Sequence, residues 1–211
     1  MPIGGGRTDI LDIRELITNA LQVLRDFLND CISSNDPREN KRASLLSYWV
    51  KNYIQMLRHE RPQSYRRFQR GDVVKVDFGF RIGSEHGGLH YAVILNSNDS
   101  RRAPVVTVIP LTSLKAEEQR SALHFGEIDL GDQLVQKLRN KLMLSPTPAL
   151  QREVDRLKIG SIALTNQIVT ISKVRITDPV RGSSPLSGIR LNSDAMDNID
   201  TVLRTFLFTN N

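Results

Sequence analysis

Residues 70–113 read RGDVVKVDFGFRIGSEHGGLHYAVILNSNDSRRAPVVTVIPLTS, three segments of apolar and β-branched residues separated by turn-forming loops. The first segment alternates near period two, which is typical of a strand with one buried face. The other two are short apolar runs, and the loops between the segments are rich in Gly, Asn, Asp and Ser. The predicted strands are residues 73–78, 91–95 and 105–111.

Further strands and helices follow this stretch. Residues 161–164 and 168–171 read as two more strands. Leucines recur at helical spacing within residues 131–158, and a closing helix begins at Ser193 with acidic residues in its first turns. Five or more short strands without regular intervening helices favour a small antiparallel barrel over a parallel βαβ sheet. The predicted fold class is therefore α+β.

The apolar periodicity before residue 58 is helical. Apolar residues recur every three or four positions on two segments. Between the segments, Asp36 suits an N-cap, Pro37 the first helical position and Glu39 the capping-box partner. Two amphipathic helices joined by a short loop predict an antiparallel hairpin over residues 9–60. Its apolar stripe has three possible partners, namely the hairpin itself, the following domain or another subunit. The stripe residues are Ile10, Ile13, Ile17, Ala20, Leu24, Phe27, Cys31, Leu46, Trp49, Tyr53 and Met56 or Leu57.

A basic linker, RHERPQSYRRFQR, occupies residues 58–70 and contains five arginines. Arginines interleaved with Tyr65 and Phe68 suit phosphate binding and base stacking. The alternative is a solvated linker that leads into the first strand, and the sequence leaves both open.

The composition is that of an ordinary globular protein, with 211 residues, 39% hydrophobic and 25% charged. The single cysteine, Cys31, excludes an internal disulfide and favours a reducing compartment. No segment has the roughly 20 apolar residues of a membrane helix, so we expect a cytoplasmic protein with no membrane partner. The net charge of +6 is compatible with a polyanionic partner. No cluster of residues has metal-ligand spacing, so we expect no metal and no cofactor.

Two blocks of the sequence resemble the MazF/PemK toxins of bacterial toxin–antitoxin systems. The first is residues 70–113, with its opening RGD, hydrophobic strand and GSEHGG loop. The second is GSIALTNQIVTISKVRI at residues 160–176, and the closing helix is similar as well. The resemblance covers residues 69–130 and 158–209, and it leaves out the hairpin and residues 131–157.

This resemblance implies a fold, an activity and partners. The fold is an SH3-like antiparallel β-barrel of the PemK/MazF/CcdB type with a C-terminal helix, over residues 67–211 with 131–157 inserted. Residues 1–66 then form a separate helical hairpin and basic linker. The implied activity is metal-independent cleavage of single-stranded RNA at short sequences by a homodimer, through 2′-hydroxyl attack that leaves a 2′,3′-cyclic phosphate. A cognate antitoxin protein would occupy the RNA groove.

The resemblance also implies positions for the catalytic groups. The family has a catalytic Arg just after the Gly-Gly loop and a catalytic Thr or Ser at the end of the next strand. In this sequence His90 stands at the Arg position, and Thr112 and Ser113 match the hydroxyl position. A histidine titrates near neutral pH and can serve as general acid or base, but it lacks the permanent charge and the bidentate phosphate contact of arginine.

The loop and nearby basic residues are the expected RNA contacts. Arg81, or the pair Arg101 and Arg102, would supply the charge that His90 lacks. Each position also has a plainer interpretation: His90 as a structural histidine, Thr112 and Ser113 as turn residues, Gly87-Gly88 as a hairpin turn, and Gln167 as a partner of backbone groups. The expected RNA-binding residues are Arg81, Ser84, Glu85, His86, Gly87, Gly88, Arg101, Arg102 and Gln167.

Three functions compete at this point. The first is a sequence-specific endoribonuclease toxin. The second is a non-catalytic protein of the same fold that binds RNA, an antitoxin-like partner or a topoisomerase, which the loss of the family's arginine would fit. In the third, residues 9–60 are a fused regulatory segment that covers the RNA groove.

Overall fold

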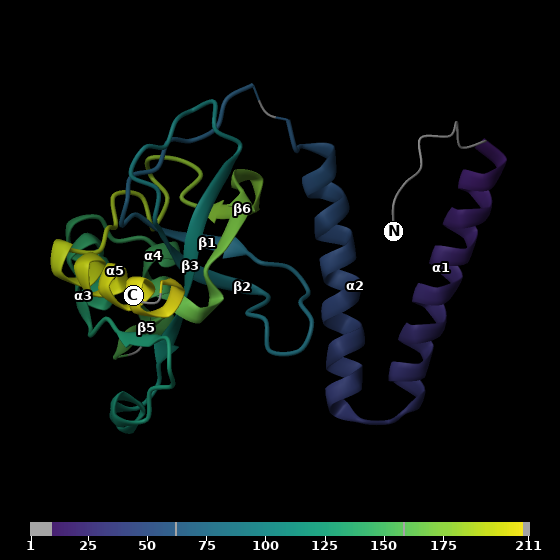
Figure 1. Cartoon of the computed structure of the whole chain (residues 1–211), viewed down its shortest axis with the longest axis horizontal. Coiled ribbons are helices and arrows are strands. Elements are labelled where there is room, and N and C mark those ends of the chain that lie inside the picture. The colour runs from purple at the N-terminus through teal and green to yellow at the C-terminus, as the bar shows by residue number, and fades with distance from the viewer. Residues whose placement is uncertain (1–9, 62, 158, 209–211) are drawn as a thin grey trace. The chain divides into compact units, whose positions relative to one another are not determined.

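The computed structural model describes residues 10–61, 63–157 and 159–208. The chain divides into two compact units, Met1–Ile54 and Gln55–Asn211. The elements of both units are labelled in Figure 1. The predictions made for residues 1–9, Pro62 and Lys158 lie outside the described residues.

The first unit contains the predicted helical hairpin, which is confirmed. Helix α1 spans Ile10–Ser33 and α2 spans Pro37–Arg58, and the second helix runs back antiparallel to the first (Figure 1). Asp36 caps α2, because its Oδ1 accepts a hydrogen bond from the Arg38 N–H at 2.8 Å. The predicted capping box is wrong: Ser34 Oγ accepts the Asp36 N–H, and the Glu39 carboxylate lies 3.4 Å from Cys31 Sγ instead.

The second unit is built on an antiparallel sheet of seven strands. Along the sheet the order is β4-β5-β3-β2-β1-β7, with β6 also paired to β3. The predicted antiparallel strands are present, but the predicted barrel is not closed, because the edge strands β4 and β7 do not pair with each other. The strands are β1 (Val73–Asp77), β2 (Leu89–Ile94), β3 (Val105–Leu114), β4 (Glu127–Asp129), β5 (Gly160–Leu164), β6 (Val169–Ser172) and β7 (Ile176–Asp178).

All five predicted strands are present within two or three residues of their expected bounds. The sequence analysis missed β4 and β7, which are three residues long and too short to show a periodicity. Three short 3₁₀ helices connect the strands: η1 (Glu117–Ser121), η2 (Thr165–Gln167) and η3 (Lys173–Arg175).

Alternating strand residues enter two separate cores. In β1, Val73 joins the larger core, whereas Val74 and Val76 join a second core on the opposite face of the sheet. The larger core also receives the apolar faces of α3 (Gln133–Leu144), α4 (Pro148–Leu157) and α5 (Ser193–Leu207). Residues 131–157 are therefore an integral part of this unit, since α3 contacts β5 and α4 contacts β3.

A buried ion pair joins α4 to the sheet. Lys75 Nζ of β1 donates hydrogen bonds to both carboxylate oxygens of Glu153 at 2.7 and 2.8 Å, and the Tyr91 hydroxyl of β2 donates to the same carboxylate. Burial by itself raises the pKa of Glu153, but the hydrogen bonds from Lys75 and Tyr91 outweigh it and hold that pKa below its usual value. The pairing of Lys75 with Glu153 thus offsets the free-energy cost of burying both charges beside the larger core.

We expect Leu138→Ala to lower the free energy of unfolding by about 2–5 kcal/mol, because the fully buried Leu138 side chain would leave a cavity in the larger core. Leu144→Ala on the same helix is the matched control, since Leu144 is 87% exposed. Urea unfolding of the full chain measures both. Equal midpoints for the two variants would contradict the placement of α3 in the core.

We expect Glu153→Gln to destabilise the protein at neutral pH by about 3 kcal/mol, because it leaves Lys75 buried without a counter-charge. A carboxyl whose pKa is lowered by folding stabilises the protein above its unfolded pKa, and this contribution is lost as the pH falls through the folded pKa. The difference between wild type and variant should therefore shrink below about pH 4. Urea unfolding at several pH values tests this, with Asp155→Asn on the exposed side of α4 as control. A difference that stays constant with pH would refute the role assigned to Glu153.

Candidate active site

The β1–β2 loop, residues 78–88, is closed at its base by backbone hydrogen bonds. The Gly88 N–H donates to Gly79 O at 2.8 Å, and the Phe78 N–H donates to Gly88 O at 2.9 Å. Gly88 has φ +85°, and a Cβ on Gly87 would lie 2.9 Å from Gly79 O. Both positions therefore require glycine for the backbone path, which supports the plainer interpretation of Gly87-Gly88 as turn residues.

Gln167 of η2 holds this loop in place. Its Oε1 accepts the His86 N–H at 3.1 Å, and its Nε2 donates to Ser84 O at 3.3 Å. Both ends of the amide are thus engaged with loop backbone. These hydrogen bonds agree with the plainer interpretation of Gln167 as a partner of backbone groups, and its RNA contact stays a prediction.

Two histidines meet beside the loop. The rings of His86 and His90 have centroids 4.1 Å apart, and the His86 ring meets Phe78 edge-on at 6.0 Å. Burial, with a smaller contribution from the neighbouring His90, lowers the pKa of His86 to about 4. Burial also lowers the pKa of His90, against an opposing hydrogen bond to the Gly87 backbone. Both imidazoles are therefore neutral at pH 7, so His90 is suited to accept a proton and carries no charge for a phosphate.

Thr112 and His90 lie at the same end of the β2–β3 hairpin. The β2–β3 ladder ends at the pair Tyr91↔Leu111, one residue short of both. The sequence-predicted base and hydroxyl are therefore on neighbouring strands, each one residue beyond the last pair of the ladder. Ser113 is the next residue and pairs with Ser161 of β5.

Thr112 and Ser113 line a cavity of about 370 Å³, here called the Thr112 cavity. It holds two groups that sequence reasoning missed, the exposed Lys115 and the exposed His124. Lys115 follows Ser113 closely enough to have been a candidate. No sequence pattern marked His124 as a site residue. It reaches the cavity because the chain turns back after η1 towards the end of β3. The remaining lining residues are Gln119, Ala122, Leu123, Glu127 and Ile162.

A smaller cavity of about 170 Å³ lies beside the β1–β2 loop and is lined by Arg81, Glu85, His86 and the η2 segment. Arg81 is anchored there, because its Nε donates to Phe78 O at 3.0 Å. One Nη atom of Arg81 lies 3.7 Å from the Glu85 carboxylate, a loose contact on a half-exposed side chain. Among the arginines predicted to supply the phosphate charge, Arg81 therefore lies at the β1–β2 loop.

Arg101 and Arg102 lie away from these groups. They belong to the turn between β2 and β3, whereas His90 and Thr112 occupy the other end of that hairpin. Ile94 lies four residue steps along β2 from His90, about 13 Å at the usual rise of a strand, and the turn lies beyond Ile94. The structure therefore does not bring this pair to the predicted catalytic groups.

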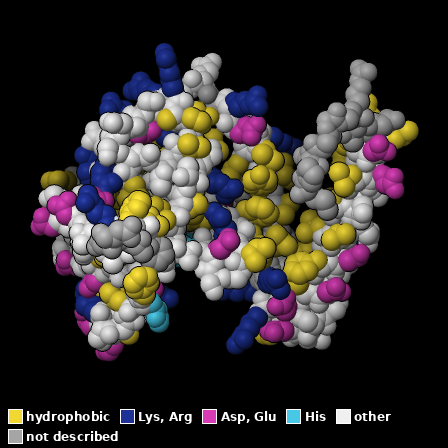
Figure 2. Space-filling view, in the orientation of Figure 1, with side chains coloured by type: hydrophobic (Ala, Val, Ile, Leu, Met, Phe, Trp, Pro, Cys, Tyr) yellow, Lys and Arg dark blue, Asp and Glu magenta, His cyan; other side chains and the backbone are white. Residues whose placement is uncertain are grey.

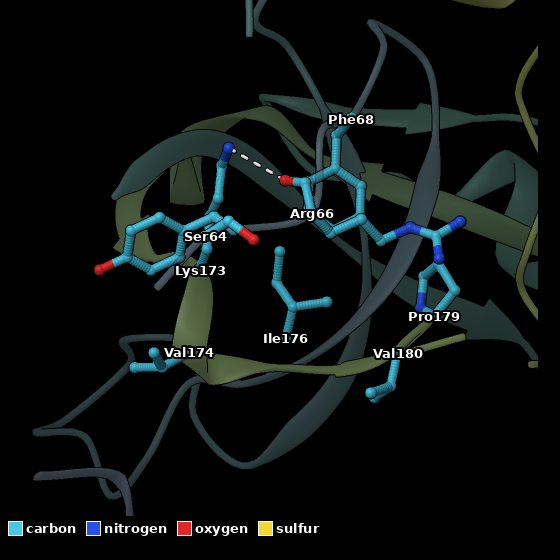
Figure 3. Close-up of a pocket in the computed structure, with 9 residues that line it drawn as sticks. Ser64, Arg66, Phe68, Lys173, Val174, Ile176, Pro179 and Val180 are labelled. Atoms are coloured by element: carbon cyan, nitrogen blue, oxygen red, sulfur yellow. Dashed lines mark hydrogen bonds between the residues drawn. The ribbon is translucent and has the colours of Figure 1, made fainter. Parts of the chain in front are cut away.

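The basic linker borders a third cavity, of about 250 Å³, shown in Figure 3. Its buried lysine, Lys173, is fully engaged: Nζ donates to both Asp99 carboxylate oxygens at 2.6 and 2.7 Å, to Ser100 O, and to Arg66 O along the dashed line in Figure 3. Phe68 is buried in the second core, and the Arg66 guanidinium donates to Ser187 Oγ at 3.2 Å. These contacts support the interpretation of this end of the linker as a structural connection.

No group of three or more His, Cys, Asp or Glu side chains in the described part of the chain is arranged to hold a metal ion. Among the helices of the described residues, none is long and apolar enough to cross a bilayer.

A family sequence model described as PemK-like, MazF-like toxin of type II toxin–antitoxin system matches residues 69–207. The chain belongs to this family. The match includes residues 131–157, which the resemblance had left outside, in agreement with the packing of α3 and α4 in the core. No curated protein matches the chain. PemK-like toxins are generally endoribonucleases, and a type II toxin implies an RNA substrate and an antitoxin partner.

For this PemK-like chain we expect an NMR titration to show His86 changing protonation near pH 4 and His90 below its usual range. His86→Ala should raise the pKa of His90, because it removes the ring that lies against the His90 imidazole and lets water in. Glu85→Gln, next to His86 but directed at Arg81, should leave His90 unchanged. A His90 that titrates at the unperturbed value in the wild type would show that it is not buried by its neighbours.

Proposed function

We propose that the chain is a sequence-specific endoribonuclease toxin that cleaves single-stranded RNA without a metal ion, acting in the cytoplasm as a homodimer that a cognate antitoxin inhibits. The family match over residues 69–207 carries this proposal. The reaction begins when a base removes the proton of a ribose 2′-hydroxyl. The 2′-oxygen then bonds to phosphorus, the bond from phosphorus to the 5′-oxygen breaks, and that oxygen takes up a proton. The products are a 2′,3′-cyclic phosphate and a 5′-hydroxyl.

We assign the base to His90, because its lowered pKa leaves the imidazole unprotonated at neutral pH. Thr112 and Ser113 would donate hydrogen bonds to the phosphate oxygens as negative charge develops on them. His124 would return a proton to the leaving 5′-oxygen. We assign this role to His124 from its position, since it is an exposed imidazole that lines the same cavity as Thr112.

The positive charge of the family's arginine has to come from elsewhere. Arg81 lines the cavity beside the β1–β2 loop, and Lys115 lines the Thr112 cavity. We assign phosphate binding to these two cations. Either cation would stabilise the phosphorane by charge, although Lys115 lacks the planar two-pronged contact of an arginine.

A second candidate function rests on the same histidine. A neutral His90 supplies no charge to the phosphate, which fits a protein that keeps the groove and binds RNA or a protein partner without cutting. The two functions differ in whether the wild-type protein cleaves RNA.

We expect the purified protein to cut a long single-stranded RNA at discrete sites in EDTA and to leave 5′-hydroxyl ends. His90→Ala should slow cleavage by about 10²–10⁴-fold, the usual contribution of general acid–base catalysis. His59→Ala, in the linker outside the site, is the matched control and should cut like the wild type. Mapping of the 5′ ends and single-turnover rates provide the measurement. No cleavage by the wild type but cleavage by His90→Arg would establish the binding function in its place.

The same assay tests the source of the phosphate charge. Arg81→Ala should reduce the cleavage rate, while Arg102→Ala, at the far end of the β2–β3 hairpin, should not. Full activity of Arg81→Ala would exclude compensation by this arginine.

A further inference from the structure

The N-terminal hairpin exposes broad apolar faces on both helices. On α1 the apolar residues cover about half of the helix circumference, wider than the stripe that one neighbouring helix covers. Most of this face is open to solvent: Leu16 is 67% exposed, Ile17 52% and Leu21 60%. Figure 2 shows hydrophobic side chains gathered along both helices.

The two helices of one chain cover little of each other. In the described part of the hairpin only Cys31 and Ala43 are fully buried, and both lie near the turn. The same end holds the Arg42 guanidinium 5.0 Å above the Phe27 ring. Beyond these contacts, towards Ile10, large apolar side chains of α1 are exposed, among them Ile13 at 42% and Ile17 at 52%. Each helix of a four-helix bundle packs against two neighbouring helices. An apolar face that covers half of a helix is therefore buried when a second pair of helices joins the hairpin.

The lengths and charges of the helices favour a second copy of this hairpin. Helix α1 has 24 residues and α2 has 22, so two hairpins can match over their whole length. Helix α1 carries four acidic and two basic residues, a net charge of −2, whereas α2 carries five basic and one acidic residue, a net charge of +4. If α1 and α2 alternate around a bundle, every interface joins an acidic helix to a basic one.

We propose that the α1–α2 hairpin binds the hairpin of a second copy of the chain and forms an antiparallel four-helix bundle. In it, each α1 lies between its own α2 and the α2 of the partner. This self-association is separate from the proposed RNA chemistry, since it uses none of the groups assigned to cleavage. It also differs from any contact between the sheet units, because its apolar surface belongs to residues 10–58.

Trp49 provides a specific readout for this interface. It is the only tryptophan in the chain, it lies on the apolar face of α2, and its ring stacks on Tyr53 with centroids 5.1 Å apart. The sheet unit contains no tryptophan, so the emission reports on the hairpin alone. Pairing of hairpins should remove water from Trp49 and shift its emission to shorter wavelength.

The test is a dilution of the full chain over roughly a 1000-fold range, followed by Trp49 emission and by sedimentation. We expect the emission to move to longer wavelength at low concentration, at the same midpoint as the loss of the sedimenting dimer that depends on the hairpin. An emission typical of exposed tryptophan, unchanged with concentration, would overturn the proposal even if the sheet units still form dimers.

Variants on α1 separate the apolar face from the rest of the helix. The double variant Ile17→Glu, Leu21→Glu should weaken this association by about 100-fold or more, because it places two charges where two apolar side chains would be buried. Asn19→Glu, on the polar side of the same helix, should leave it nearly unchanged. Equal effects of the double variant and of Asn19→Glu would overturn the proposal. If the double variant loses its helical structure, the dilution of the wild-type chain still tests the proposal.

Discussion

The ten residues of β3 organise the sheet unit, because three other strands depend on them for pairing. Val108 pairs with Ile94 of β2 and also with Val169 of β6, so β2 and β6 lie on opposite edges of β3. Further along that second edge, β5 replaces β6 from Leu111 onward. One long strand thus joins both halves of the sheet, supplies residues to both major cores and carries Thr112 and Ser113 just before its end at Leu114. The candidate active site is a consequence of where β3 ends.

Two buried lysines secure the periphery of this sheet in different ways. Lys75 binds Glu153 and so attaches α4 to β1, while Lys173 gathers Asp99 and two backbone carbonyls beneath the linker. Each ammonium has its partners in place, which offsets the cost of removing a charge from water. Neither lysine is free for a ligand. The cations proposed for phosphate are two others, the half-exposed Arg81 and the exposed Lys115.

The site combines neutral imidazoles with hydroxyls and peripheral cations. A family member with arginine at the position of His90 holds a charge where the phosphate would lie. In this chain the charges proposed for the phosphate are those of Arg81 and Lys115, and burial lowers the pKa of His90. The proposed chemistry therefore assigns proton removal to His90 and charge stabilisation to the two cations, whereas an arginine at that position would itself supply the charge.

The sequence by itself determined the two amphipathic helices, the five longer strands and the family, because each is encoded in local periodicity or in short ordered motifs. Through the family motif, it also identified His90 and Thr112 as candidate catalytic residues. Only the tertiary structure decided the rest. The sheet is open because its three-residue edge strands do not pair, and residues 131–157 belong to the core because α3 and α4 bury their leucines there. The turn after η1 carries His124 to the Thr112 cavity, and hairpin geometry keeps Arg101 and Arg102 away from it. These outcomes depend on contacts between residues far apart in the chain, and local patterns carry no record of such contacts.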